Sequence, residues 1–359
     1  MDALPDEILN IWITKKNAPT CKLWLKIWRL RSMEIKPFCC DVDFIHKFEN
    51  VRILDLSEYG KITGPTGDLK VLKVVKLDPN PHITDNMLQK MTMITTLSLV
   101  SNGTITGSSF RYLTNITSLN IDLNNMITDN TLKFLTNLEN LKMEDCNEIN
   151  GLSLKYLTKI NTLSLHDQKT IKNVSYLTNI TSLSMVRCLK ITDKTIKRLT
   201  NLTRLIFSRC PLITDNSIKL LTNLTHLDFR GRKGITDAST KKLTNIRWLA
   251  LEKADHISFV SIRKMTNLTK LQLSDYDVMD YQLKKLTALK YLELYDCMVT
   301  DKSIRHLTNL ENLLAHNSQD ICTEDIYGLT NLTNLWAPEC DDINKTHVQL
   351  RFPNLTFDV

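Results

Sequence analysis

Pairs of apolar residues separated by one polar position recur along this chain at intervals of about 20–22 residues, a spacing typical of stacked repeats. In the segment Leu227-Asp228-Phe229-Arg230, apolar and polar side chains alternate with a period of two, which predicts a short, half-buried strand. We use the first apolar residue of each pair as a marker of the unit. Fifteen markers run to the C-terminus: Leu54, Val75, Leu97, Leu119, Leu141, Leu163, Leu183, Leu205, Leu227, Leu249, Leu271, Leu292, Leu313, Leu335 and Leu355.

A second pattern follows each strand and predicts a helix. The string Ile191-Thr192-Asp193 places capping side chains before apolar residues at Ile196 and Leu199, which are three apart. We therefore expect a helix of two or three turns in each unit. Because such a unit cannot bury its apolar face alone, the units must stack into a solenoid with a parallel sheet on one side and helices on the other.

The turn after each strand carries a recurring small or polar residue, three positions beyond the second apolar one. A side chain of this kind can pack close to the backbone and bond neighbouring amide groups, so the turn needs neither Gly nor Pro, and the chain has only 9 of each in 359 residues. Arg232 and Tyr276 are too large for this position, so we expect their turns to bulge outward. The small residues are Cys146, Cys188, Cys210, Cys297 and Cys340, with Asn80, Asn102 and Asn124 in earlier units.

The segment from Leu205 to Asp215 resembles the cysteine-containing class of leucine-rich repeats, whose pattern is L-x-L-x-x-C-x-x-I-T-D. The resemblance implies an α/β fold, a leucine-rich-repeat solenoid (horseshoe) with about 15 repeats of about 20–22 residues, here spanning 49–359. That class of repeat is associated with F-box proteins.

The first 48 residues have a different composition and predict a small helical module. They hold Trp12, Trp24 and Trp28, three of the five tryptophans of the chain. The opening string L-P-D-E-I-L resembles the start of an F-box, and C-K-L-W at residues 21–24 resembles its later C-K-x-W, although the two strings lie closer together than the family usually places them. The resemblance implies a shortened F-box that docks on the Skp-family adaptor of a cullin-RING ubiquitin ligase. The residues carried over to adaptor binding are Leu4, Pro5, Ile8, Leu9, Trp12 and Trp24.

Two functions follow from these patterns. In the first, the chain is the substrate receptor of an SCF-type ubiquitin ligase, with the F-box on the adaptor and the sheet face on a target protein. In the second, it is an intracellular binding scaffold without a ligase link, and residues 1–48 only cap the apolar end of the solenoid. The polar positions that flank each apolar pair define the target-binding face, where Arg and aromatic residues are the types that most often dominate binding energy. We expect an acidic target segment against the arginines and an apolar element against the aromatics. The predicted target-binding residues are Arg187, Arg204, Arg209, Arg230, Trp248, Tyr291, Tyr295 and Trp336.

Composition and motifs argue against several other classes of function. The net charge of +7 is modest, and acidic residues interleave with the arginines, so nucleic-acid binding is not expected. The sequence has no apolar run long enough to span a membrane, no zinc-ligand spacing and no nucleotide or nucleophile motif, so we expect no metal, no cofactor and no enzymatic activity. The acidic N-terminus is unlike a signal peptide, which favours the cytoplasm or nucleus over secretion. Frequent Asn, Ile, Lys and Thr are typical of an AT-rich genome, such as that of a protist or a large DNA virus.

Overall fold

A computed structural model of the chain describes most residues from Glu34 onward. The described residues are 34–35, 39–41, 50–57, 61–63, 69, 71–231, 234–276, 283–297, 299, 304–317, 321, 323–338, 340 and 343–358. All six residues predicted to bind an adaptor lie outside this set. The chain divides into two compact units, Met1–Leu138 and Glu139–Val359.

The first unit contains a parallel sheet whose strands follow chain order. Each strand pairs with the next at equivalent repeat positions, as in Val75 opposite Leu97 and Leu97 opposite Leu119. The strands are β1 (Glu34–Ile35), β3 (Ile53–Asp55), β5 (Val74–Lys76), β6 (Thr96–Ser98) and β7 (Ser118–Asn120). The helices between them are α4 (Asp85–Leu88), η2 (Ser108–Tyr112) and α5 (Asp129–Leu132).

The sheet begins ahead of the repeats that the sequence pattern marks. Strand β1 pairs with β3, with Ile35 opposite Leu54, so the sheet includes a strand ahead of the first marker. Strand β2 (Cys39–Asp41) pairs with β4 (Lys61–Thr63) in a separate two-stranded sheet. Ile35 is buried although its segment lacks the repeat pattern, which explains why the periodicity did not reveal it.

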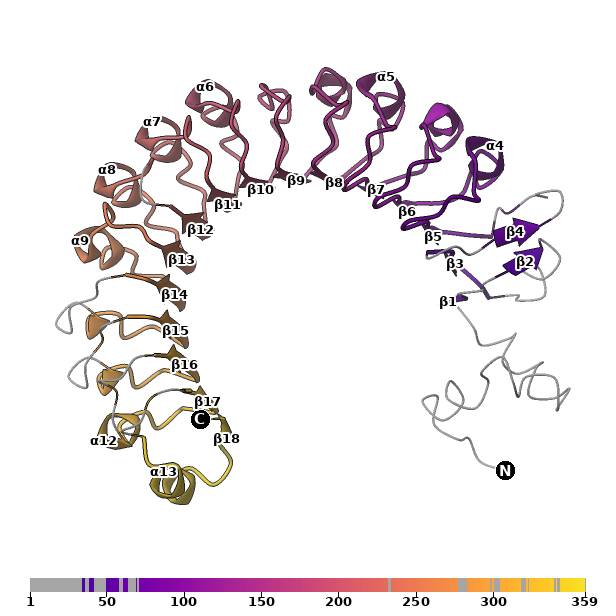
Figure 1. Cartoon of the computed structure of the whole chain (residues 1–359). Coiled ribbons are helices and arrows are strands. Elements are labelled where there is room, and N and C mark those ends of the chain that lie inside the picture. The colour runs from indigo at the N-terminus through magenta and orange to yellow at the C-terminus, as the bar shows by residue number, and fades with distance from the viewer. Residues whose placement is uncertain are drawn as a thin grey trace, which may run out of the picture. The chain divides into compact units, whose positions relative to one another are not determined.

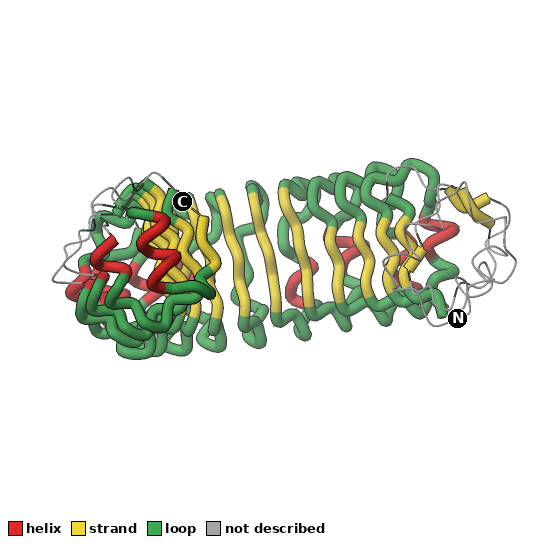
Figure 2. The backbone as a smooth tube through the Cα atoms, turned by 90° about the horizontal axis from the view of Figure 1, so that it is seen from below, coloured by secondary structure: helices red, strands yellow, loops and turns green. Residues whose placement is uncertain are grey.

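The second unit continues the same architecture over eleven strands. Figure 1 shows its strands along one side and its helices along the other, and Figure 2 shows the strands side by side. The strands are β8 (Asn140–Glu144), β9 (Thr162–His166), β10 (Ser182–Val186), β11 (Arg204–Ser208), β12 (His226–Arg230), β13 (Trp248–Glu252), β14 (Lys270–Ser274), β15 (Tyr291–Tyr295), β16 (Asn312–His316), β17 (Asn334–Trp336) and β18 (Thr356–Asp358). The helices are η3 (Ser153–Tyr156), α6 (Asp193–Ile196), α7 (Asp215–Ile218), α8 (Asp237–Thr240), α9 (Phe259–Ile262), α12 (Thr323–Ile326) and α13 (Lys345–Arg351).

The register confirms the period-two interpretation of the strands. Leu205, Leu227 and Leu249 lie opposite one another and are fully buried, while the residues between the apolar pairs face the other side of the sheet. The last marker was wrong by two residues, because Phe357 and not Leu355 pairs with Leu335. Most helices are also shorter than predicted, with four residues and therefore about one turn. A repeat this short leaves room for little more between two strands.

Three ladders of hydrogen bonds join neighbouring repeats and account for the polar consensus. In the inward turn, the amide of Asn102 donates to the carbonyl groups of Leu77 (3.1 Å) and Asn80 (3.0 Å) and accepts from the backbone of Thr104 and Ile105. Cysteines fill the same position with a thiol that donates to the previous repeat, as Cys188 does to Leu165 (3.1 Å). The prediction that the inward turn uses small polar side chains is therefore confirmed where Asn and Cys occupy it.

The expectation that Tyr276 points outward was wrong. Its side chain is buried, and its hydroxyl donates to the carbonyl of Ile257 in the previous repeat. Tyrosine thus replaces the polar atom of Asn or Cys with one at the end of a longer side chain. Arg232, for which the same was expected, lies outside the described residues.

The other two ladders lie away from this turn. The carboxylate of Asp193 accepts from the backbone N–H (2.8 Å) and hydroxyl (2.6 Å) of Thr214 in the next repeat, and Asp215 binds Thr236 in the same way. The Asn of each L-T-N string donates to a Thr carbonyl of the previous repeat, as in Asn201 to Thr178 (2.9 Å). The I-T-D and L-T-N strings are therefore structural.

Candidate protein-interaction surface

The solvent-facing side of strands β11 to β15 presents one continuous row of cationic and aromatic side chains. Register places the first residue of each strand opposite the next, which brings together Arg204, His226, Trp248, Lys270 and Tyr291. We call these five residues the first row. All five are half-buried.

Cation–π contacts connect the members of the first row. The guanidinium of Arg204 lies 4.6 Å from the ring centre of Trp248, and the ammonium of Lys270 lies 5.1 Å from the same ring. Lys270 also lies 3.8 Å from the ring centre of Tyr291. His226 meets Trp248 edge to face at 5.5 Å. Stacking of this kind fixes the side chains before any partner arrives, which lowers the entropy lost on binding.

Hydrogen bonds to neighbouring side chains of the sheet fix the positions of Trp248 and Tyr291. The indole N–H of Trp248 donates to the side chain of Gln272 (2.7 Å), which in turn donates to Glu293 (2.6 Å). The hydroxyl of Tyr291 donates to the same carboxylate (2.8 Å). Burial, together with this hydrogen bond, raises the pKa of Tyr291 well above its ordinary value, so the phenol stays a donor at neutral pH.

His226 is held in its neutral form by its surroundings. Burial and the positive charges of Arg204 and Arg247 lower the pKa of its imidazole. The ring nitrogen Nδ1 lies 2.8 Å from the hydroxyl of Thr225. At neutral pH the first row therefore carries its positive charge on Arg204 and Lys270.

An acidic hollow of about 350 Å³ lies beside the first row, toward the ends of strands β12 to β15. Four carboxylates and one guanidinium line it, so its net charge is negative. The guanidinium belongs to Arg230, which contacts Asp228 (3.2 Å) and Glu252 (3.8 Å). The charged lining residues are Asp228, Arg230, Glu252, Asp275 and Glu293.

A stacked aromatic group borders this hollow on the C-terminal side. Tyr295, which also lines the hollow, stacks on His316 with ring centres 4.4 Å apart, and His316 lies 5.9 Å from Trp336. Tyr295 is 45% exposed and Trp336 is 39% exposed. Large exposed aromatic side chains on a sheet face are typical anchors for protein partners.

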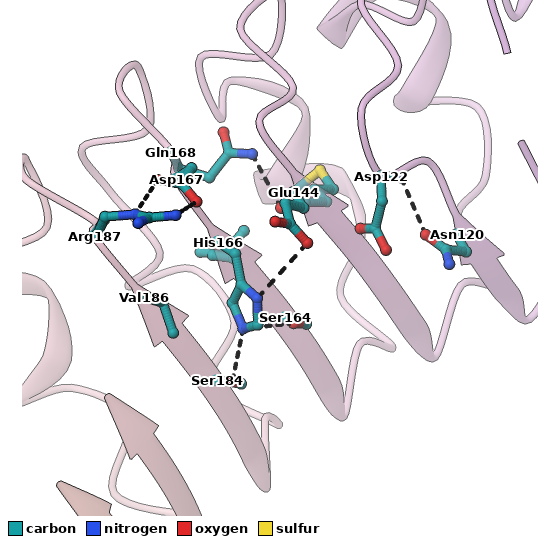
Figure 3. Close-up of polar contacts among 12 residues, drawn as sticks. Asn120, Asp122, Glu144, Ser164, His166, Asp167, Gln168, Ser184, Val186 and Arg187 are labelled. Carbon is teal, nitrogen blue, oxygen red and sulfur yellow. Dashed lines mark hydrogen bonds and ion pairs between the residues drawn. The ribbon is translucent and has the colours of Figure 1, made fainter. Parts of the chain in front are cut away.

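The four predicted arginines occupy different environments. Arg187 follows strand β10 in a left-handed backbone conformation, and its guanidinium makes two hydrogen bonds to Asp167 (Figure 3). The contact lowers the pKa of the Asp167 carboxyl. Arg209 has the same left-handed backbone conformation directly after the end of β11. With Arg187 and Arg230 already paired with carboxylates, the arginines offer less free positive charge to an acidic partner than the sequence indicated.

Sequence reasoning missed three members of this surface. His226 and Lys270 complete the first row, and His316 completes the aromatic stack. A comparison of all strand-initial positions in register would have found the first two, because they are the direct equivalents of Trp248. His316 ends strand β16 as Tyr295 ends β15, so the same comparison would have paired them.

Neither a metal site nor a membrane-spanning helix is found in the described part of the chain. Among residues that the structure describes, no group of three or more His, Cys, Asp or Glu side chains could hold a metal ion. Over the same residues, no helix has the length and apolar character required to cross a membrane.

The fold matches solved structures of several repeat proteins. An internalin from Listeria monocytogenes is 26% identical in sequence, with a TM-score of 0.57, over 80% of this chain and 86% of the other. A leucine-rich-repeat protein from Leptospira interrogans is 18% identical, with a TM-score of 0.56, over 88% and 91%. Rad7 in its yeast complex with Elc1 is 20% identical, with a TM-score of 0.52, over 81% of each chain. No protein-family model and no curated protein sequence matches the chain. The register, the repeat length and these structures together show that the protein has a leucine-rich-repeat solenoid fold.

Proposed function

We propose that the protein is an interaction scaffold that binds a target protein on the sheet face of strands β11 to β17. The observation that carries this proposal is the first row, where Trp248 lies between two cations in a fixed geometry. The acidic hollow and the Tyr295–Trp336 stack extend the surface with features of different chemistry. Together they suit a partner segment that has basic as well as apolar side chains, in place of the acidic segment expected from sequence.

Substitution of the anchors tests this surface. Trp248→Ala and Trp336→Ala should each weaken target binding by about 2 kcal/mol, as for interface residues that dominate affinity. Proteins captured from the native source with the intact chain and quantified by mass spectrometry give the readout, and Tyr112→Ala, an exposed aromatic residue of η2, is the matched control. A capture profile that is the same for all three variants would contradict the proposal.

The finer proposal is that the scaffold is the substrate receptor of an SCF-type ubiquitin ligase. Its support is the resemblance of residues 4–9 and 21–24 to an F-box, ahead of a repeat class found in such receptors. The adaptor-binding residues would be Leu4, Pro5, Ile8, Leu9, Trp12 and Trp24. The Rad7 structure provides a related arrangement, because that solenoid was solved in complex with a second protein, Elc1.

A pull-down of a purified Skp-family adaptor by the full-length chain tests the ligase proposal. Ile8→Glu together with Leu9→Glu should abolish adaptor binding, while Asn17→Glu, a polar position in the same segment, should leave it intact. If the folded intact chain does not bind the adaptor, the alternative holds, in which residues 1–48 act only as a cap and the protein is a scaffold without a ligase link. Loss of target capture by Trp248→Ala would still support the scaffold in that case.

A further inference from the structure

The shortest unit of the second half leaves an open space on the helical side of the solenoid. The unit from Leu163 to Leu183 is two residues shorter than its neighbours, and residues 167–181 form no helix. The next unit has helix α6 at the corresponding place. A hollow of about 780 Å³ lies here, lined by Lys172, Asn173, Ser175, Lys190, Thr192, Lys194, Thr195, Lys197, Arg198 and Leu212.

The lining of this basic hollow carries five positive charges and no carboxylate. None of the five cationic side chains makes an ion pair with any residue that the structure describes. The nearest acid in the sequence, Asp193, directs its carboxylate to Thr214 and Ser217 of the following repeat. The positive charges are therefore not neutralised from within the lining. The five are Lys172, Lys190, Lys194, Lys197 and Arg198.

The inter-repeat carboxylate ladder is interrupted at the same place. Asp193, Asp215 and Asp237 each accept hydrogen bonds from the N–H and hydroxyl groups of the Thr or Ser one repeat later. The residue that would do this for Thr192 is Asn173, whose side-chain oxygen instead accepts from the N–H of Ser175 (2.9 Å). Within the described chain, the N–H and hydroxyl of Thr192 donate to no protein group.

The neighbouring repeats show which kind of acceptor the N–H and hydroxyl of Thr192 can bind. Where the ladder is intact, the two oxygens of an Asp carboxylate accept these two hydrogen bonds, and Thr192 has no carboxylate at this position. An anion from solution can take that position and meet the cations of the lining as well. Charge-assisted hydrogen bonds from Lys and Arg are about twice as strong as neutral ones, and Arg198 can bind two oxygens of a phosphate at once.

We propose that the basic hollow binds a compact oligophosphate, a small ligand with several phosphate groups. Five cations within two successive repeats match a ligand with several negative charges in a small volume. A nucleic-acid strand would instead require a basic track along many repeats. The following repeats provide no such track on this side, because the carboxylates of Asp215 and Asp237 are retained there.

Calorimetric titration of the full-length chain with inorganic tripolyphosphate at near-physiological salt tests the proposal. We expect saturable binding with one site per chain. Lys172→Ala combined with Lys194→Ala should weaken it at least about tenfold, the effect of losing one charge-assisted contact. Lys241→Ala combined with Lys242→Ala is the matched control, because these two residues directly follow α8 and are the equivalents of Lys197 and Arg198, but they lie outside the hollow.

Asn173→Asp gives a second test that does not remove any cation. The new carboxylate should restore the ladder to Thr192, occupy the anion position and weaken tripolyphosphate binding at least about tenfold, without loss of thermal stability. Three results would overturn the proposal: absence of saturable binding, equal weakening in the Lys241/Lys242 control, or tighter binding of a short single-stranded RNA or a phosphoserine peptide than of tripolyphosphate.

Discussion

Asn102 of the inward turn is the position where a single substitution should most clearly expose the energetics of the solenoid. Its side chain is 1% exposed and makes four hydrogen bonds to backbone groups, two as donor and two as acceptor. Asn102→Ala removes all four. In the equivalent turn at Ala254, the N–H of Ile257 bonds to the backbone carbonyl of Ala254 (3.0 Å). The bond from the N–H of Ile105 is therefore the one that the backbone can replace.

The expected cost follows from the groups that remain without partners. With one of the four bonds replaced by the backbone, three backbone groups lose their partner, and the carbonyl groups of Leu77 and Asn80 are buried by the next repeat. At about 1–3 kcal/mol for each of these two buried carbonyl groups, Asn102→Ala should destabilise this region by about 2–6 kcal/mol. Asn102→Cys should cost about 1–2 kcal/mol less, because a thiol can donate to Leu77 as Cys188 does to Leu165.

Hydrogen exchange measured by mass spectrometry is the suitable assay, because a repeat array opens locally and global unfolding need not be two-state. Peptides that cover residues 96–106 should exchange about two to three orders of magnitude faster in Asn102→Ala than in the native chain. Asn86→Ala, at an exposed position of α4, should change exchange by less than a factor of about 3. The reasoning fails if Asn102→Ala is as protected as the native chain, or if Asn102→Cys is less protected than Asn102→Ala.

Three further predictions concern single residues. Leu123 has φ +58° and is 49% exposed, so Leu123→Asn should stabilise the chain by about 0.5–1 kcal/mol in urea unfolding, whereas Leu152→Asn, at a right-handed exposed position, should not. Tyr276→Phe leaves the buried carbonyl of Ile257 without its donor, so the free energy of unfolding should fall by about 1–2 kcal/mol and the melting temperature should fall with it. An unchanged melting temperature would contradict the assigned bond. The pKa of His226 is lowered in the folded state, so the unfolded chain binds more protons as pH falls through 6.5, and the free energy of unfolding should decrease there. His226→Gln should flatten this part of the stability profile against pH. A profile identical to that of the native chain would refute the prediction.

The repeat strings predicted the strands because one periodic signal recurs along nearly the whole chain. Leu205, Leu227 and Leu249 occupy equivalent buried positions, and no special local chemistry is needed to find them. Helix length was overestimated because apolar spacing at Ile196 and Leu199 is compatible with a helix that continues, whereas the chain returns toward the next strand after one turn. Strand β1 has only two residues and lacks the pattern, so its place in the sheet depends on long-range packing.

The candidate surface was predictable as a list of outward positions but not as a set of contacts. Register from sequence placed Trp248 and Tyr291 on the sheet face, yet the ion pair that neutralises Arg187 comes from Asp167, which is also held in a left-handed conformation by the turn. Side-chain pairing at such turns depends on backbone geometry that the repeat pattern does not encode. The same holds for Tyr276, whose size suggested exclusion from a turn that in fact buries it.

The three ladders explain where this protein can vary without losing its fold. The Asp of I-T-D, the Asn of L-T-N and the residue of the inward turn each bond to the adjacent repeat, so a change at any of them leaves a group in the neighbour without its partner. The strand residues that face solvent are not part of these ladders, and the first row and the acidic hollow are built from them. Asn173 also replaces a ladder carboxylate, in a unit that is two residues short and beside a cationic lining. Gly107 and Gly151 also lack the carboxylate at this position, so the substitution alone does not indicate a ligand; what favours the proposed anion is the coincidence of the substitution with five cations that have no carboxylate in the lining.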